Sequence, residues 1–343
     1  MPSGSYKLST MKRANNLLPR IEDMDNLELA FWKASKGKRY ASSVLAYQTH
    51  LDKHLLALQQ DIRRGKIELG DYRYFYVYEP KKREICASAF GEQVFHHALM
   101  NVCHEHFDKV QIYDSYASRK GKGTYAALER AKKYTRKYTW FLKLDVRKFF
   151  ASIHHDVLKK QLARRFKGKR LLSLFDQIID SYAHNPERGL PIGNLTSQYF
   201  ANHYLCGLDH FIKESLACKA YVRYMDDMVL WANDKGSLQQ LYGEITGYIE
   251  NQLRLQLKPK QLNRTVLGLP FLGYRLHPCY VRLLGKSRKR FIHKIKKIQG
   301  KLADGEWDQH IAHRHVLPLL AFTQHADSLA LRQQVLKEIG LTS

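Results

Sequence analysis

The most constraining feature of the sequence is a set of three aspartates embedded in apolar, strand-forming segments. Residues 138–144 (YTWFLKL) form an apolar run that ends at Asp145, and residues 220–232 contain two short apolar segments that flank Asp226 and Asp227. A buried carboxylate without a partner is costly, and two adjacent carboxylates repel each other unless a cation neutralises them. The pattern therefore predicts a β-hairpin with two aspartates at its tip, close to a strand that ends in a third.

Divalent metal is the usual partner for such a group of carboxylates. Carboxylate oxygens are the ligands that Mg²⁺ prefers, and two Mg²⁺ ions about 3.5–4 Å apart can clamp the attacking and leaving oxygens of a phosphoryl transfer. A strand end and a neighbouring hairpin tip would build that site. A turn that simply favours aspartate is the structural alternative, and the tetrad Tyr224–Asp227 alone does not decide between the two.

The charge balance points to a polyanionic partner. Lys and Arg number 57 against 32 Asp and Glu, and the net charge of +25 is spread along the whole chain rather than confined to a tail. A folded protein with this much self-repulsion usually has a polyanion to neutralise it, and nucleic acid is the leading candidate. A basic protein that is merely soluble is the alternative.

The cysteines and the apolar runs argue against several other classes of protein. Five widely spaced cysteines without a CxxC pair speak against a disulfide scaffold and a structural zinc site, and they fit a reducing cytoplasm. No run of about 18 apolar residues occurs, so we expect no membrane span. The N-terminal residues lack the apolar region of a secretory signal.

Hydrophobic periodicity predicts an α+β chain with a helical end. A loose basic arm is expected over residues 1–24, followed by a short helix that Asp25 or Asn26 caps. Strands are expected at 72–78, 83–87, 138–144, 220–224, 228–232, 266–276 and 280–284, and helices at 44–64, 92–107, 155–166, 170–183, 196–213, 237–253, 287–302, 308–321 and 327–339. The change to a basic helical pattern near residue 285 predicts two domains, 1–285 and 286–343.

Two further segments suggest contact with phosphate. The first two strands read as a hairpin whose turn, Glu79–Lys82, gives it a basic tip. Residues 115–124 (SYASRKGKGT) form a glycine-rich basic loop, and Thr124 is expected to cap the helix that follows. The loop lacks P-loop spacing, so a phosphate site and a plain solvated turn both stay open.

Six segments, in family order, resemble the motifs of reverse transcriptases. Tyr224–Asp227 resembles their YxDD box, and residues 142–153 (LKLDVRKFFASI) resemble their first palm motif. The others are the basic hairpin of the fingers, residues 189–198 (GLPIGNLTSQ), Lys258–Lys260 near the triphosphate, and the primer-grip hairpin at residues 271–274 (FLGY). The resemblance implies a right-hand polymerase fold, with fingers and palm of antiparallel sheet plus helices over residues 1–285 and a small helical thumb over residues 286–343.

The resemblance narrows to the reverse transcriptases of diversity-generating retroelements. Ile192 stands where most bacterial reverse transcriptases carry glutamine, and residues 96–99 (HHAL) and 115–124 are also similar to that subfamily. This resemblance implies an enzyme that copies a template-repeat RNA into cDNA and misincorporates opposite adenine. It also implies a small basic accessory variability protein, in an oligomeric assembly, as a partner.

The resemblance implies roles for the aspartates and their neighbour. Asp145 and Asp226 would bridge two Mg²⁺ ions, with Asp227 supporting them and the backbone carbonyl of Val146 completing one metal shell. The 3′-hydroxyl of the growing strand would then attack the α-phosphate of a dNTP, and pyrophosphate would leave.

The remaining roles concern the nucleotide, primer and template. The residues implied at the nucleotide are Lys82, Arg83, Phe150, Ile192, Gly193 and Lys260. Phe150 would exclude a ribose 2′-hydroxyl, while Phe149 is the better candidate for plain core because strand-like alternation would point the two rings in opposite directions. The residues implied at primer and template are Tyr224, Phe271, Leu272, Gly273, Tyr274, Lys286, Arg288 and Arg290.

Two other functions compete with this interpretation. A non-mutagenic bacterial reverse transcriptase, of a retron-like or phage-defence type, would share the chemistry but not the errors at adenine. A catalytically inactive RNA-binding module would share only the basic surface, and the presence of Asp145, Asp226 and Asp227 argues against it.

Overall fold

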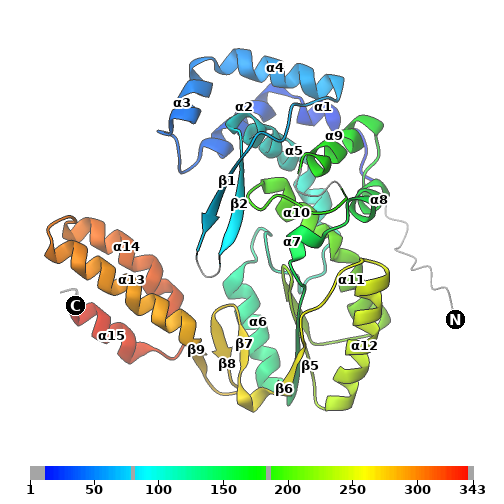
Figure 1. The fold of residues 1–343 in the computed structure, drawn as a ribbon. Helices are drawn as coiled ribbons and strands as arrows, with labels where there is room; N and C mark the ends of the chain where they lie inside the picture. The colour runs from blue at the N-terminus through cyan, green and yellow to red at the C-terminus, as the bar shows by residue number, and fades with distance from the viewer. Residues whose placement is uncertain (1–11, 79–81, 183–186, 339–343) are drawn as a thin grey trace. The chain divides into compact units, whose positions relative to one another are not determined.

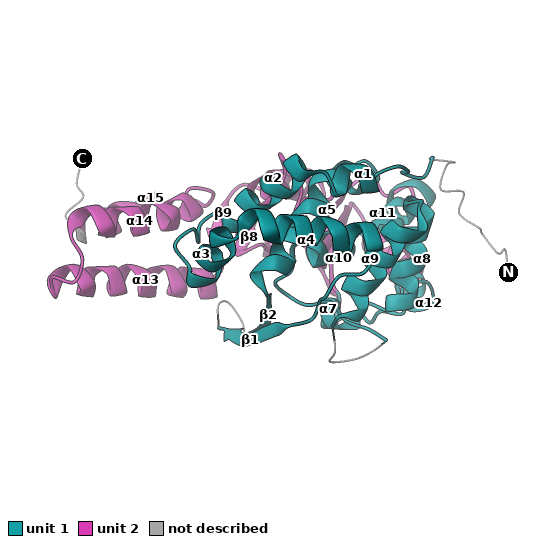
Figure 2. Cartoon of the chain, turned by 90° about the horizontal axis from the view of Figure 1, so that it is seen from above, with its two compact units in different colours: residues 1–113, 146–215, 245–258 teal, residues 114–145, 216–244, 259–343 magenta. Residues whose placement is uncertain are grey.

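The computed structural model describes residues 12–78, 82–182 and 187–338, which are a mixture of helices and antiparallel sheet. The first eleven residues of the expected arm, and Glu79, Pro80 and Lys81 of the expected hairpin turn, lie outside the described residues. The chain divides into two compact units. Residues 1–113, 146–215 and 245–258 form the first, and residues 114–145, 216–244 and 259–343 form the second (Figure 2). No boundary between the units falls at residue 285, so a domain boundary there stays a prediction.

The first unit is mostly helical and is built around one long helix. Helix α5 (Phe90–Asp108) contacts α1 (Leu18–Ile21), α2 (Met24–Ser35), α3 (Ser42–Thr49) and α10 (Leu195–Tyr204), and it is buried along most of its length. The other helices of this unit are α4 (Leu51–Arg64), α7 (Phe149–Ser152), α8 (His155–Arg165), α9 (Lys169–Asp180), α11 (Cys206–His210) and the π-helix η1 (Phe211–Ser215). Strands β1 (Tyr72–Val77) and β2 (Arg83–Ser88) form a two-stranded antiparallel hairpin (Figure 1).

The N-terminal predictions need correction. The expected loose arm is wrong for its described part, because Ala14 pairs with Phe166 and its N–H donates to the Arg165 carbonyl at 3.0 Å. The N-cap of α2 is Asp23 rather than Asp25 or Asn26, and its side chain accepts hydrogen bonds from the N–H groups of those two residues. Gly65 ends α4 in the left-handed conformation, one position after the helix end expected at residue 64.

The second unit contains the sheet that carries the aspartates. Its strands are β3 (Trp140–Asp145), β4 (Tyr221–Tyr224), β5 (Asp227–Ala232) and β6 (Gln261–Arg264), hydrogen-bonded in the antiparallel order β4-β5-β3-β6. A second sheet has the order β7 (Leu269–Phe271), β8 (Tyr274–Leu276) and β9 (Val281–Leu283). Helix α6 (Thr124–Lys137) contacts both β4 and β8, and helix α12 (Lys235–Asn251) contains the passage of the chain into the first unit.

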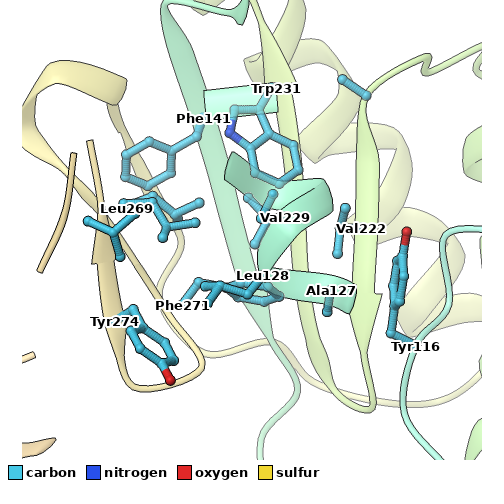
Figure 3. Packing of buried hydrophobic residues seen from close by; sticks show 14 of the residues in the cluster. Tyr116, Ala127, Leu128, Phe141, Val222, Val229, Trp231, Leu269, Phe271 and Tyr274 are labelled. Carbon is cyan, nitrogen blue, oxygen red and sulfur yellow. The ribbon is translucent and has the colours of Figure 1, made fainter. Parts of the chain in front are cut away.

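One apolar core joins α6 to both sheets of this unit (Figure 3). Phe141 of β3 and Val229 and Trp231 of β5 are at most 2% exposed, and they pack with Leu128 of α6 and Phe271 of β7. The indole N–H of Trp231 donates to Thr135 Oγ1 at 3.2 Å, so its polar edge is satisfied. This packing fixes the ends of β3 and β5, where the aspartates lie.

The three helices expected at the C-terminal end are present as α13 (Gly285–Ala303), α14 (Gln309–Thr323) and α15 (Leu329–Glu338). They have an apolar cluster of their own, which includes Phe291, Ile295 and Val316.

Three predicted elements elsewhere are interrupted. The helix expected at 44–64 is divided at His50 into α3 and α4. The helix expected at 196–213 is divided into α10, α11 and η1, and the strand expected at 266–276 consists of the 3₁₀ turn η2 (Thr265–Leu267) followed by β7 and β8. Within the described ranges, no helix combines the length and the apolar character needed to cross a membrane.

Candidate active site

The hairpin between β4 and β5 carries two of the three aspartates. Tyr224 and Asp227 pair across the end of the hairpin, and Met225 and Asp226 form its two-residue turn. Met225 lies in the left-handed region with φ of 55°, which costs a side chain of this kind roughly 1–2 kcal/mol. Arg223, which is 0% exposed, donates from its guanidinium to the Met225 carbonyl at 3.0 Å. The buried Arg223 guanidinium therefore stabilises the strained turn through its hydrogen bond to the Met225 carbonyl.

The third aspartate lies on the neighbouring strand. In the register of β3 with β5, Asp145 is directly opposite Asp227. Directly opposite residues on antiparallel strands have Cβ atoms about 4.5–5.5 Å apart, close enough for two carboxylates to interact. All three aspartates are half-buried. The sheet therefore gathers three partly desolvated carboxylates at one end of β3 and β5.

Lys143 forms an ion pair with one of the three aspartates, Asp227. Its ammonium lies 2.9 Å from Asp227 Oδ2 and donates to the Pro270 carbonyl, also at 2.9 Å. The side chains of Lys143 and Asp227 are only 15% and 22% exposed. Burial raises the pKa of Asp227 to about 6; Lys143 opposes that increase, while Asp145 and Asp226 add to it. The other carboxylate oxygen, Asp227 Oδ1, is buried without a hydrogen-bond partner among the described residues.

These donors fit Mg²⁺ in their chemistry. They are carboxylate oxygens, they are held at one place by strand register, and Asp227 Oδ1 has unused capacity to accept. In the described part of the chain, no group of three Asp, Glu, His or Cys side chains is arranged to hold an ion as it stands. Asp227 Oδ2 is instead occupied by Lys143, so binding a metal through both oxygens would require that ion pair to open.

Tyr224 is tied to the glycine-rich loop. Thr124 Oγ1 donates to the Tyr224 hydroxyl at 3.1 Å, and the Tyr116 N–H of the loop donates to the Arg223 carbonyl at 3.0 Å. The prediction that Thr124 caps α6 is wrong, because Gly123 takes the N-cap position and the Thr124 side chain faces Tyr224 instead. Through these two hydrogen bonds the loop stabilises the β4–β5 hairpin that carries the aspartates. Phosphate contact by the loop and primer contact by Tyr224 stay predictions.

The FLGY segment forms a second tight hairpin, between β7 and β8. Leu272 and Gly273 both have positive φ, of 48° and 93°, as the commonest two-residue hairpin turn requires. Phe271 and Tyr274 are 0% exposed, and the Tyr274 hydroxyl donates to the Phe322 carbonyl at 2.6 Å. These two side chains are core residues of this unit, and the primer contact implied for them stays a prediction. Contact with the primer stays a prediction for Leu272 and Gly273 at the tip.

The other basic residues predicted in this unit lie on its surface. Lys260 is exposed, and its ammonium lies over the ring of Tyr242, 3.8 Å from the centroid. On α13, Lys286 and Arg288 are exposed and Arg290 is half-buried, while Phe291 and Ile295 of the same helix face the apolar cluster. Helix α13 is therefore amphipathic, with a basic face available to a polyanion.

In the first unit, the basic end of the β1–β2 hairpin is exposed. Val77 pairs with Arg83, and both Lys82 and Arg83 lie in solvent. The Lys82 ammonium lies 4.2 Å from the ring centroid of Tyr76, an attraction that holds the lysine against the strand. These two cations are neighbours in the sequence at the exposed end of the hairpin, and their contact with a triphosphate stays a prediction.

Ile192 and Gly193 are fastened to the same hairpin. The Cys86 N–H donates to the Ile192 carbonyl at 2.8 Å. Gly193 has φ of 141°, and a Cβ there would lie 2.3 Å from the Cys86 carbonyl oxygen. Only glycine allows the two backbones to approach this closely, so backbone packing alone explains why position 193 is glycine, independently of any ligand.

Phe149 and Phe150 follow Asp145 by four and five positions. They lie in the one-turn helix α7 rather than in a strand, so the alternation expected for them is wrong. Their environments nevertheless differ, because Phe149 is 3% exposed whereas Phe150 is half-buried. Val146 is fully buried and pairs with Leu257. The roles of Phe150 and of the Val146 carbonyl stay predictions.

Sequence reasoning missed Lys143 and Arg223. Lys143 lies two positions before Asp145, and residues two apart point to the same face of a strand, so a lysine in the apolar run YTWFLKL was a usable signal. It is also the diagonal neighbour of Asp227, within reach of a long side chain. Arg223 gave a similar signal as a charged residue inside the apolar segment before the turn.

Comparison with known proteins identifies the family to which this chain is similar. A family model described as "Reverse transcriptase (RNA-dependent DNA polymerase)" matches residues 83–276, more than half of the chain. A COX1/OXI3 intron 1 protein of Saccharomyces cerevisiae is 24% identical over 212 residues, which are 58% of this chain and 25% of that protein. Protein YkfC of Escherichia coli is 22% identical over 276 residues, 64% of this chain and 72% of that protein.

A solved structure supports the fold. The apo telomerase from Candida tropicalis, truncated from its C-terminal domain, superposes with a TM-score of 0.50 at 12% identity, over 68% of this chain and 60% of that one. The fold is thus of the right-hand polymerase class. The chain spans about a quarter of the length of the yeast intron protein that it matches.

Proposed function

The chain belongs to the reverse transcriptase family, and from that premise we propose that it is an RNA-directed DNA polymerase with its chemistry at Asp145, Asp226 and Asp227. The observation that carries the proposal is the β3–β5 register, which sets Asp145 opposite Asp227 beside a strained turn that holds Asp226. A plain structural turn would not need a third carboxylate on the neighbouring strand, since like charges that face each other destabilise a sheet.

The three carboxylates would hold two Mg²⁺ ions, with the Val146 carbonyl as a further ligand. When bound, the ions supply charge neutralisation at the attacking and leaving oxygens. The protein holds the three carboxylates in position. Arg223 fixes the turn through the Met225 carbonyl, and Lys143 keeps Asp227 ionised near neutral pH by lowering a pKa that burial raises.

The basic residues would bind the nucleic acid and the nucleotide. Lys82, Arg83 and Lys260 are exposed cations suited to a triphosphate, and guanidinium groups can pair with phosphate oxygens through two hydrogen bonds. Phe150, half-buried beside core Phe149, would exclude the 2′-hydroxyl of a ribonucleotide. The basic face of α13 would follow the backbone of the template–primer duplex without reading its sequence.

Within this function, we propose the mutagenic role of a diversity-generating retroelement. The supporting observation is Ile192, whose branched side chain offers no hydrogen bond at a position fastened to the hairpin through its own carbonyl. A site that hydrogen-bonds its substrate can reject a wrong one strongly, while an apolar wall discriminates by only about 1–3 kcal/mol per missing group. The proposal includes a template-repeat RNA, a small basic accessory protein in an oligomeric assembly, and action in the cytoplasm.

Primer extension on a defined RNA template with Mg²⁺ and dNTPs tests the polymerase. The double variant Asp226→Ala, Asp227→Ala should lose synthesis yet bind RNA with nearly unchanged affinity, because affinity comes from dispersed basic charge. RNA affinity is measured on the same preparations as the control for folding. Synthesis retained by this variant would refute the assignment of the metal site.

Sequencing of the cDNA tests the mutagenic role. The template carries scattered adenines, and errors are scored opposite each base for the wild type and for Ile192→Gln. Excess errors at adenine that fall selectively in the variant would support the role. Uniformly accurate copying by the wild type would instead identify a non-mutagenic reverse transcriptase, and an adenine error rate unchanged in an active variant would remove Ile192 from the mechanism.

A further inference from the structure

A cationic pocket lies in the first unit, where the chain continues beyond Asp145. Its volume is about 450 Å³. It is lined by four cations and two neutral polar residues, which are Arg147, Lys148, Arg188, Arg254, Ser152 and Gln256. None of these six residues has an acidic, aromatic or aliphatic side chain. The lining therefore offers positive charge and hydrogen bonds, and it has no surface on which a base could stack.

Backbone contacts join the three chain segments that form the pocket. The Arg147 N–H donates to the Gln256 carbonyl at 2.7 Å. Arg188 pairs with His154 in an antiparallel bridge, and the Ser152 hydroxyl donates to the Arg147 carbonyl at 3.1 Å. The backbone that carries the cations is thus fixed in the folded chain before any ligand binds.

Most of the positive charge in the pocket lacks a counterion in the described part of the chain. Arg254 lies 3.2 Å from Asp156 Oδ2, whereas Arg147, Lys148 and Arg188 form no ion pair among the described residues. All four cations are exposed, so a ligand can reach them from solvent. Since like charges repel, an anion that lies among these cations would be attracted to all of them.

Two of the four cations lie on strained backbone. Lys148 has φ of 46° and Arg254 has φ of 51°, in the left-handed region that residues other than glycine seldom adopt. Only seven of the described non-glycine residues have positive φ, and one of the others is Met225, next to Asp226 in the aspartate turn. Backbone strain of this kind clusters at catalytic and binding sites. Two strained cations in one pocket therefore favour a binding role over a merely solvated surface.

The chemistry of the pocket suits a compact polyanion. Guanidinium groups pair with phosphate oxygens through two hydrogen bonds, and linked phosphates supply more charge and more acceptor oxygens than a single phosphate does. A nucleic-acid backbone matches less well, because it spreads its charge along an extended strand. A nucleotide also matches less well, because the lining has nothing that could hold its base. These criteria favour two linked phosphates without a base, which is inorganic pyrophosphate.

We propose that this pocket binds pyrophosphate, the product that leaves when the proposed polymerase extends a strand, and that it does so separately from the incoming nucleotide. The inference rests on the proposed function and adds a product site to it. Arg147 follows Asp145 by two residues, so their Cα atoms are at most about 7 Å apart. Lys82, Arg83 and Lys260, which are proposed to hold the triphosphate, do not line the pocket. Pyrophosphate released beside Asp145 therefore finds a second set of cations close by.

Isothermal titration calorimetry of the full chain with sodium pyrophosphate, in the absence of divalent metal, tests the pocket apart from the aspartates. Wild type should bind pyrophosphate about tenfold or more tightly than inorganic phosphate. Arg147→Gln and Arg188→Gln should each weaken pyrophosphate binding about tenfold, as the loss of one charge-assisted hydrogen bond predicts. The affinity for dTTP should change by less than about twofold in the same variants.

Arg164→Gln is the matched control. Arg164 is an exposed arginine of α8 in the same unit, but it does not line the pocket and forms no ion pair with any described residue. Its pyrophosphate affinity should stay within about twofold of wild type. Thermal unfolding of all three variants separates weakened binding from loss of the fold.

Primer extension with Mg²⁺ in excess over pyrophosphate supplies a second readout. In Arg147→Gln and Arg188→Gln the inhibition constant of pyrophosphate should rise about tenfold, while the KM for dNTP changes by less than about twofold. A rise in the KM for dNTP that equals the rise in the inhibition constant would show that one site serves both ligands, and it would overturn the proposal.

Two further results would overturn it. Pyrophosphate affinity unchanged in both variants would show that the pocket does not bind this ion. A loss of affinity for a short RNA, with pyrophosphate binding intact, would assign the pocket to the nucleic-acid backbone. A wild type that binds pyrophosphate through Arg147 and Arg188 but makes no cDNA would support the pocket and refute the proposed function.

Discussion

Replacing Asp227 by asparagine should stabilise the folded protein while removing its proposed activity. The pKa of Asp227 is raised from 3.8 to about 6, mainly by burial, which means that the ionised carboxylate is less stable in the folded chain than in the unfolded one. A difference of this size corresponds to roughly 3 kcal/mol at pH values above both pKa values. Asparagine keeps the shape of the protonated acid and does not carry this cost.

The sign of the pH dependence follows from linkage. Because the folded-state pKa is raised, the contribution of Asp227 to stability is fully present below pH 3.8 and is lost as the pH rises through about 6. The stability difference between Asp227→Asn and the wild type should therefore be near zero at pH 4 and reach roughly 2–3 kcal/mol in favour of the variant at pH 7.5. The variant loses the ion pair between residue 227 and Lys143. Lys143 keeps its hydrogen bond to the Pro270 carbonyl, so its ammonium is not left without an acceptor and the cost of losing the ion pair is limited.

Urea unfolding at several pH values, in buffer with a metal chelator, measures this difference. Asp156→Asn makes the same chemical change where the sign is opposite: slight burial acts to raise the pKa of Asp156, but Arg254 and Lys160 outweigh it and lower the pKa. That control should lose stability at neutral pH instead of gaining it. An Asp227→Asn variant that is less stable than wild type at pH 7.5, or equally stable at every pH, would refute the account of Asp227 as a strained carboxylate.

Three other perturbations test neighbouring parts of the argument. Lys143→Met removes the cation that lowers the Asp227 pKa, so the acid limb of the pH–activity profile should move upward by about 1–3 pH units, and an unmoved limb would contradict the pairing. Gly193→Ala should cost at least about 2 kcal/mol in urea unfolding because its Cβ would meet the Cys86 carbonyl, whereas Gly243→Ala, with open space around it, should be neutral or stabilising by up to about 1 kcal/mol. Phe150→Ala should admit ribonucleotides in a primer-extension assay that compares dNTP with rNTP; an unchanged ratio in an active enzyme would place the discrimination elsewhere.

The sequence was informative where strand pattern and chemistry agree. Three aspartates in apolar strands gave the end of β3 and the β4–β5 hairpin, because period-two burial and the two-residue turn leave little freedom of register. The positions of the terminal helices also followed from periodicity alone. These features depend on neighbours in sequence, which a single chain displays directly.

Features that depend on distant segments were not accessible in the same way. The turn at FLGY was expected, but the burial of Phe271 and Tyr274 depends on α6 and on Phe322, far along the chain. The close approach of Gly193 to Cys86 joins segments about a hundred residues apart. The alternation expected for Phe149 and Phe150 is wrong because β3 ends at Asp145 and, after a short turn, the chain forms the helical turn α7 instead of continuing as a strand.

A buried polar atom without a hydrogen-bond partner among the described residues does not by itself identify a ligand site. Gln161 Oε1 and Ser197 Oγ are buried without a partner in the described part of the chain as well, and neither belongs to the group of aspartates. Asp227 Oδ1 differs because Asp145 lies directly opposite Asp227 on the neighbouring strand. A ligand that satisfies such atoms binds only the folded chain and must therefore stabilise it. Mg²⁺ should accordingly raise the stability of the wild type more than that of Asp227→Asn.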